Sequence, residues 1–326
     1  MRVLIKAGHS ICDSSIRGVD SNMNSLRALA TRCYANAYLL LSVTTFFWAG
    51  NAVAGKIVAG LVTPVTMTFL RWTLAALLVL LLARKHLRRD MSALMRQWPL
   101  VFGLGALGFS AFNLLLYSAL NYTTAINVTI EQSAMPVTIM LVNFIAFRQR
   151  IRALQCVGVV ATIVGVVVTA SHGDPWLVIA QGMNVGDALM LGTVLLYSGY
   201  TVALRYKPAV HGLSLMAGMC VSAWLFTSPF FAYEVIEKGF EWPVATAWGA
   251  IIFAATGPAI VSQLFFMRGV ELIGSNRAGV FINLVPIFGA VLAVLILNED
   301  FQAFHLLALV LVLGGIAVAE RFAPPN

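Results

Sequence analysis

The segment from Trp98 to Ala119 reads WPLVFGLGALGFSAFNLLLYSA and contains no charged residue. An α-helix rises about 1.5 Å per residue, so an apolar segment of about 20 residues is long enough to cross the hydrocarbon core of a membrane. The segment therefore predicts a membrane-spanning helix.

Segments of this kind recur along the whole chain. Of its 326 residues, 60% are hydrophobic and only 10% are charged, whereas a globular chain is typically about 45–50% apolar and about 25% charged. A soluble protein of this size could not cover its surface with so few charges, and a disordered chain would need more of them. We therefore predict an all-α polytopic membrane protein with ten transmembrane helices. The ten apolar segments are 37–59, 64–83, 98–119, 124–146, 152–170, 187–205, 213–233, 246–267, 276–297 and 303–320.

Almost all positive charges lie on one side of these ten segments. Eighteen of the 21 Lys and Arg residues fall in the two termini or in the loops that follow even-numbered spans, and only Lys238 follows an odd-numbered one. Cytoplasmic loops carry an excess of Lys and Arg, so both termini are predicted to be cytoplasmic. We expect the bacterial inner (plasma) membrane, and we interpret the net charge of +8 as a topology signal rather than a nucleic-acid surface.

The second half of the chain repeats the first. When residues 98–170 are shifted by 150 positions they fall on 248–320 without a gap. Because each unit has five spans, an odd number, the second unit must insert upside down. The sequence therefore predicts two inverted five-helix repeats. The matched pairs include Trp98 with Trp248, Leu114 with Leu264, Pro136 with Pro286, Gly165 with Gly315, and Asn113 with Gln263, a carboxamide in both cases.

These patterns divide the chain into predicted parts. Residues 1–36 form a cytoplasmic N-terminal tail, in which residues 1–22 are a candidate extension ahead of a start at Met23. The predicted parts that follow are a first repeat (37–170), an external linker (171–186), a second repeat (187–320) and a cytoplasmic C-terminus (321–326).

Several motifs resemble the drug/metabolite transporter superfamily. The segment Trp48-Ala-Gly-Asn51 followed by Lys56 resembles its opening, and Pro64 followed by Arg71 resembles its second helix. A proline in the middle of the fourth and ninth helices, followed by a Gly-rich last helix, resembles its two EamA-type repeats. The resemblance covers about residues 37–320 and is greatest to bacterial exporters of amino acids and aromatic metabolites. It implies a ten-helix transporter with alternating access, whose cavity is lined by helices 1, 3, 4, 6, 8 and 9.

Three ionisable residues within the predicted spans are candidates for a functional role, namely Lys56, Arg71 and Glu131. Such groups are costly in a bilayer and usually face a cavity or a partner. In one interpretation Arg71 and Glu131 form a structural ion pair, and Lys56 extends to the surface. In the other, Glu131 titrates during transport or the pair gates the outer mouth. The second repeat has Cys220 and Phe281 at the positions equivalent to Arg71 and Glu131.

Polar and aromatic residues on the predicted helices form the candidate substrate-binding set. Asn113 and Gln263 occupy equivalent positions in the two repeats, and inverted-repeat transporters bind substrate where the repeats meet. The alternative interpretation is that such residues only join helices by hydrogen bonds. The set comprises Trp48, Asn51, Asn113, Tyr117, Gln132, Ser133, Tyr197, Tyr200, Gln263, Phe266 and Asn283.

Pro136 and Pro286 are candidates for helix kinks or gating. A proline inside a helix leaves the carbonyl four residues earlier without its hydrogen bond, here those of Gln132 and Ile282. At membrane depth such a carbonyl is tolerated where it faces a cavity or another group. A simple kink is the alternative.

The predicted function is export of small neutral metabolites by a secondary transporter. Amino acids with aromatic or aliphatic side chains suit an aromatic cavity with carboxamides and few charges. The alternatives are a multidrug or cationic-toxin exporter, an importer or exchanger of another metabolite, and an integral-membrane lipid-modifying enzyme. The chain has no P-loop and no paired metal-ligand motif, so we predict no enzymatic activity, no cofactor and no metal. The expected partners are the substrate and the bilayer but no nucleic acid, and both a monomer and a dimer are compatible with the sequence.

Overall fold

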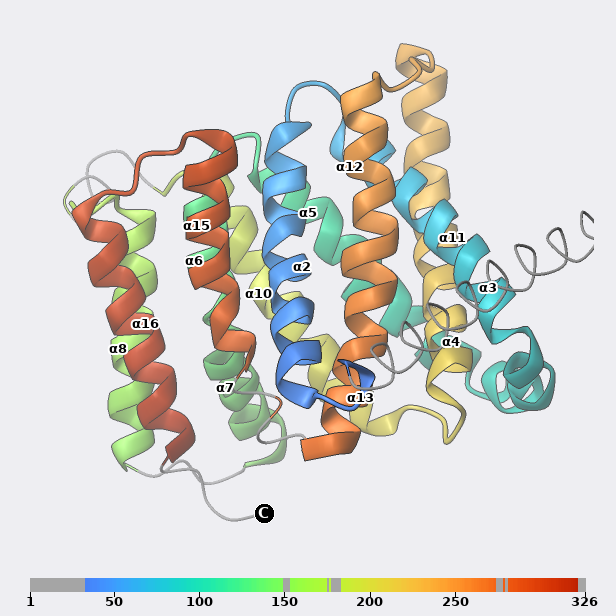
Figure 1. The fold of residues 1–326 in the computed structure, drawn as a ribbon, viewed down its shortest axis with the longest axis horizontal. Coiled ribbons are helices and arrows are strands. Elements are labelled where there is room, and N and C mark those ends of the chain that lie inside the picture. The colour runs from blue at the N-terminus through green and yellow to red at the C-terminus, as the bar shows by residue number, and fades with distance from the viewer. Residues whose placement is uncertain are drawn as a thin grey trace, which may run out of the picture.

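The computed structural model describes residues 33–148, 153–174, 176, 183–273, 278 and 281–321. All regular secondary structure in these residues is helical, and the helices stand side by side in one bundle (Figure 1). We call the end where α2 ends and α3 begins the predicted outer end, and the opposite end the predicted inner end.

Five spans form each repeat, and several of them are built from more than one helical element. The first repeat contains α2 (Ala37–Ile57), α3 (Pro64–Arg96), α4–η1–α5 (Trp98–Gly103, Leu104–Ala111, Phe112–Ala119), α6–α7 (Ala125–Gln132, Met135–Phe147) and α8 (Ala153–Ala170). The second contains α10–η2 (Val185–Ala203, Leu204–Tyr206), α11 (Gly212–Lys238), α12–η3–α13 (Ala245–Thr256, Gly257–Val261, Ser262–Ile273), η4–α15 (Phe281–Leu284, Val285–Leu297) and α16 (Ala303–Arg321).

The described helices confirm the predicted fold class. Eight of them are long and apolar enough to cross a membrane, and two shorter apolar helices, Phe281–Leu297 and Ala303–Ala319, complete the ten.

The irregular features of the two repeats coincide. A π-helical turn interrupts the third span at η1 and the eighth at η3, and α7 and α15 both begin one residue before the central proline. Packing between the repeats follows the same symmetry. Helix α2 packs against α13 and α15, whereas α10, its counterpart, packs against α5 and α7. The first helix of each repeat therefore packs against the third and fourth spans of the other repeat.

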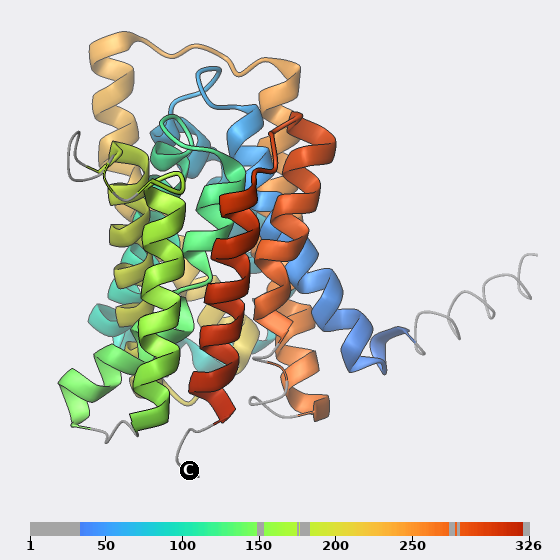
Figure 2. The ribbon, with the colours of Figure 1, turned by 90° about the vertical axis from the view of Figure 1, so that its left-hand side faces the viewer.

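The remaining spans pair across the bundle. Helix α3 packs along α11, and α8 packs along α16 at one edge, where both views show them side by side (Figures 1 and 2). A Cβ built on Gly158 would lie 2.4 Å from the carbonyl oxygen of Gly315. Glycine at both positions thus lets these two backbones meet directly.

Two carboxylates form hydrogen bonds between the repeats at the predicted outer end of the bundle. Glu299 accepts hydrogen bonds from the backbone N–H groups of Ala125 (2.8 Å) and Ile126 (3.0 Å) and so caps the N-terminus of α6. Glu234 on α11 accepts from the hydroxyl of Thr66 at 2.7 Å, in the first turn of α3. Both contacts tie the second repeat to the first.

The predicted basic loop after residue 83 is instead helical, because α3 continues to Arg96. Its apolar residues Leu87 and Leu94 pack against the neighbouring core, and Asp90 accepts a hydrogen bond from the backbone N–H of His211 at 3.0 Å. The segment is therefore an amphipathic extension of the span, which hydropathy alone cannot distinguish from a loop.

Candidate substrate cavity between the two repeats

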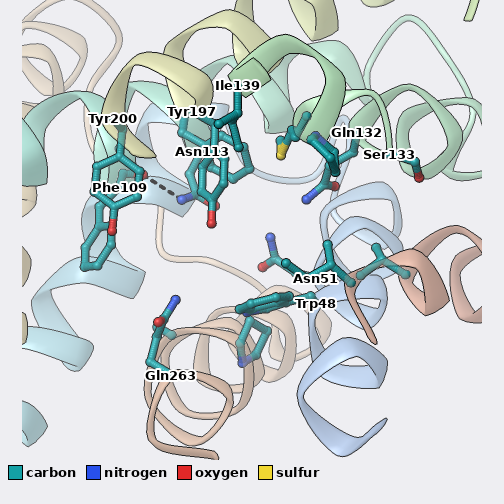
Figure 3. Close-up of a pocket in the computed structure, with 18 of the residues that line it drawn as sticks. Trp48, Asn51, Phe109, Asn113, Gln132, Ser133, Ile139, Tyr197, Tyr200 and Gln263 are labelled. Carbon is teal, nitrogen blue, oxygen red and sulfur yellow. Dashed lines mark hydrogen bonds between the residues drawn. The ribbon is translucent and has the colours of Figure 1, made fainter. Parts of the chain in front are cut away.

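A cavity of about 960 Å³, part of which is open to solvent, lies where the two repeats meet. Seven of the ten spans contribute to its wall (Figure 3). The lining residues are Trp48, Asn51, Arg71, Trp72, Gly108, Phe109, Phe112, Asn113, Gln132, Ser133, Met135, Pro136, Ile139, Tyr197, Tyr200, Pro258, Ala259, Gln263, Ile282 and Val285.

The cavity follows the internal symmetry of the chain. Shifting the lining residues of the first repeat by 150 pairs Gly108 with Pro258 and Asn113 with Gln263, all four of which line the wall. The two π-helical turns supply the Gly108–Pro258 pair, and such turns occur frequently at functional sites.

The breaks in the fourth and ninth spans open onto this cavity. Helix α6 ends at Gln132 and α7 begins at Met135. Gln132 and Ile282, which lie four residues before Pro136 and Pro286, occupy equivalent positions in the two repeats, and both lie on the wall. The Ser133 hydroxyl donates to the carbonyl of Thr129 at 2.8 Å, so it is already used within its own helix.

Aromatic rings form most of one side of the cavity. Trp72 and Phe109 stack with ring centroids 4.8 Å apart, and Tyr197 lies 5.4 Å from Tyr200. Space for the Tyr200 ring depends on Gly108, since a Cβ there would lie 2.1 Å from the ring. Trp48 and Gln263 face these rings from the opposite side (Figure 3).

The guanidinium of Arg71 occupies a buried polar cluster at the cavity wall. It donates to Asn113 Oδ1 (2.6 Å), to Asn51 Oδ1 (3.1 Å), to the carbonyl of Ala254 (3.1 Å) and to the Tyr117 hydroxyl. The Tyr117 hydroxyl in turn donates to Asn51 Oδ1 at 2.8 Å. The cluster thus joins helices 1, 2, 3 and 8.

The predicted ion pair between Arg71 and Glu131 is wrong. Arg71 is only 2% exposed, and all of its hydrogen bonds in the described part of the chain go to neutral groups. Neither carboxylate oxygen of Glu131 has a hydrogen-bond partner among the described residues. Carboxamide, phenol and carbonyl oxygens surround the guanidinium where an acid was expected, and the Trp72 ring lies 4.8 Å from its central carbon.

Lys56 is half-buried, and two backbone carbonyls hold its ammonium group. Its ammonium donates to the carbonyls of Leu120 (2.9 Å) and Thr123 (2.7 Å). These carbonyls follow the last turn of α5, where a cation stabilises the unpaired C-terminal carbonyls of a helix. Lys56 is therefore a helix cap within the first repeat.

Most of the candidate binding residues share this one cavity. Eight of the eleven line it, together with Arg71 and Pro136. Tyr117 contacts Arg71 behind the wall, Phe266 packs against Trp48 with centroids 5.5 Å apart, and Asn283 follows the lining residue Ile282.

Sequence reasoning missed Trp72 and the helix 2 contribution to the wall. The repeat offset could have identified Pro258 and Ala259, because they are the equivalents of Gly108 and Phe109. No three His, Cys, Asp or Glu side chains within the described ranges are placed to hold a metal ion.

The helices on the predicted outer side of the cavity are densely packed. Every residue of α2 from Ala49 to Gly55 is buried, and so is every residue of α6 from Ala125 to Glu131. On the other side of the break, only Met135 and Val137 of α7 are buried. The fourth span is thus sealed in its predicted outer half and less covered in its predicted inner half.

Comparisons with known proteins agree with this architecture. The sequence profile of the EamA-like transporter family matches residues 35–171 and 184–320. The chain is 22% identical over 284 residues to the uncharacterized transporter YetK of Bacillus subtilis, covering 86% of each chain. It is also 22% identical over 297 residues to the uncharacterized transporter YyaM of the same organism, covering 88% of this chain and 94% of YyaM.

A solved crystal structure shares the fold. It aligns with a TM-score of 0.60 at 21% sequence identity and covers 87% of this chain and 96% of its own.

Proposed function

Because the chain belongs to the EamA-like transporter family, we propose that it is a secondary transporter that exports small neutral amino acids with aromatic or aliphatic side chains by alternating access. The observation that supports this proposal most is the composition of the cavity. A buried cation without an acidic partner among the described residues lies next to aromatic walls and carboxamides.

Each part of a zwitterionic amino acid has a complementary group in the cavity. The guanidinium of Arg71 would attract the carboxylate, since a planar fork of N–H donors suits carboxylate geometry. The carboxamide oxygens of Gln132 and Gln263 would accept from the ammonium group. The rings of Tyr197 and Tyr200 would cover an apolar side chain, which small-molecule sites commonly do.

The rival functions fit this cavity less well. A cationic drug requires an anionic wall, whereas none of the lining residues is acidic and one is Arg71. A nucleotide sugar requires several basic groups, and Arg71 is the single one among the lining residues. A transporter also accounts for the chain better than a lipid-modifying enzyme does, because the family is a transporter family.

A counterflow screen of the purified protein in liposomes tests the proposed substrate class. The liposomes are loaded with unlabelled solute and assayed for uptake of labelled solute, using the twenty amino acids, a cationic dye and a nucleotide sugar. We expect accumulation of phenylalanine, tyrosine or leucine above that of protein-free liposomes. Uptake of the dye with no uptake of any amino acid would favour a cationic-drug exporter over an amino-acid exporter.

We further propose that the protein lies in the bacterial inner membrane with both termini in the cytoplasm. The basic residues support this orientation. Single cysteines can test it in a chain whose native cysteines are replaced. Lys238→Cys should react with a membrane-impermeant maleimide in intact cells, whereas Arg89→Cys, equally exposed in the bundle, should react only after permeabilisation. The reverse pattern would invert the topology.

A further inference from the structure

A second set of buried polar groups lies apart from the cavity, where the two repeats meet in the predicted outer half of the bundle. Glu131 on α6 is 1% exposed and Asp187 on α10 is fully buried. None of the four carboxylate oxygens has a hydrogen-bond partner among the described residues. Two ionised carboxylates in such a place would be very costly, because a buried charge requires a partner.

The two carboxyl groups lie on neighbouring helices. Helix α6 packs directly against α10, and both side chains are buried there. Two buried carboxylates on packed helices cannot both ionise at low cost. A proton on either group leaves one negative charge instead of two.

A chain of hydrogen bonds leads to this pair from the last helix. His305 Nδ1 accepts from the backbone N–H of Gln302 at 2.9 Å, so the ring proton is on Nε2 and points at Asn127 Oδ1, 3.2 Å away. The Asn127 amide then donates to the Thr123 hydroxyl oxygen at 3.2 Å. Thr123 packs against the residue before Asp187, because a Cβ built on Gly186 would lie 2.9 Å from the Thr123 side chain.

The other ionisable groups around α6 leave this pair without a counter-ion. Lys56 on α2 is used by two carbonyls, α15 has no ionisable side chain, and α8 contributes only Cys156 at the opposite end. The exposed His172, after α8, packs against Phe304, the neighbour of His305, at the predicted outer end of the bundle.

We propose that Glu131 and Asp187 form a proton-binding pair that takes up one proton from the predicted outer side and couples its release to movement of the fourth span. Glu131 immediately precedes Gln132 at the cavity wall and the break between α6 and α7. A change of charge at Glu131 therefore acts where this span bends. The coupling step rests on the proposed transport function, but proton binding does not.

Infrared spectroscopy of the purified protein in D₂O tests proton binding without a substrate. Protonated carboxyl groups have a separate C=O band, which we expect in the wild type near neutral pD and which should disappear in Glu131→Gln. The control Glu271→Gln removes an exposed carboxylate that pairs with Arg268, and it should leave the band unchanged. A wild type without the band, or a folded Glu131→Gln that keeps it, would overturn the proposal.

A second variant and a change of salt complete the test of proton binding. If Glu131→Gln does not fold, Asp187→Asn replaces it. This variant should keep the band and move its titration midpoint by about one pH unit or more, because a neighbouring charge is lost. An unchanged midpoint would contradict a shared site. Replacing choline chloride with sodium chloride at constant pD should not alter the band, and its loss only with sodium would show a sodium site instead.

Discussion

Arg71 has the most unusual environment of any charged residue in the described bundle. It is buried, it carries a positive charge, and its partners Asn51, Asn113 and Tyr117 are neutral. Its Nε has no hydrogen-bond partner within the described ranges. A buried cation held by dipoles alone is electrostatically incomplete, so a substrate carboxylate at this point would gain more than it would in water.

Replacing Arg71 with Lys should reduce amino-acid transport sharply. An ammonium group keeps the charge but cannot reach four acceptors with a planar fork. A hydrogen bond to a charged group contributes about 1.5–3 kcal/mol, so losing one lowers the rate at low substrate concentration by roughly 10- to 150-fold. Initial counterflow rates measure this. Arg268→Lys, on an exposed pair with Glu271, is the matched control and should transport normally. Normal transport by a folded Arg71→Lys would show that Arg71 does not bind the substrate carboxylate.

Gly108→Ala should narrow the cavity by displacing one aromatic ring. Its Cβ would lie 2.1 Å from Tyr200, and Tyr200 cannot keep its position at that distance. Gly103 lies in the same span with open space where its Cβ would be, so Gly103→Ala isolates the effect of the added methyl group. We expect apparent affinity for tyrosine to fall in Gly108→Ala and to stay unchanged in Gly103→Ala. Equal behaviour of the two variants would show that Tyr200 does not shape the site.

At the scale of elements, the broken spans and the α8–α16 pair have separate roles. The fourth and ninth spans are interrupted next to the cavity, where the proposed alternating access would require movement. Helices α8 and α16 are continuous, pack along each other at the edge of the bundle and contribute no lining residue. The pair supports the repeats rather than the site.

Gly315→Ala should destabilise the α8–α16 pair, whereas Gly314→Ala should not. A Cβ on Gly315 would lie 2.5 Å from both the carbonyl oxygen of Gly158 and the hydroxyl oxygen of Thr162, but one on Gly314 would meet nothing within 4 Å. Overpacking of this kind typically costs about 1–3 kcal/mol. Thermal unfolding in detergent measures the difference, and indistinguishable melting temperatures would mean that the two helices do not rely on this contact.

The elements themselves were largely predictable, because hydropathy and the 150-residue offset depend on local sequence. The end of α3 was not, since its charged extension is helical only through packing of Leu87 and Leu94. At the site, the repeat offset led to Asn113 and Gln263. The partners of Arg71 and Lys56 could not be predicted, because a chain of neutral acceptors gives no pattern in the sequence and appears only when four helices meet.

At the scale of the whole molecule, the two repeats are built alike, yet the cluster around Arg71 exists in only one of them. Under the proposed alternating access, this cluster would open while the equivalent region of the second repeat, around Tyr200 and Gln263, closes. Substrate bound between the repeats would contact both regions and would be carried through by their exchange.

Competition against phenylalanine exchange tests most directly whether the interface cavity recognises the carboxylate of a neutral amino acid. Proteoliposomes loaded with phenylalanine are assayed for uptake of labelled phenylalanine in the presence of leucine or phenethylamine, the amine that lacks the carboxylate. We expect leucine to inhibit exchange and phenethylamine to leave it unchanged. Inhibition by phenethylamine without inhibition by leucine would contradict this expectation and would indicate a site for organic cations.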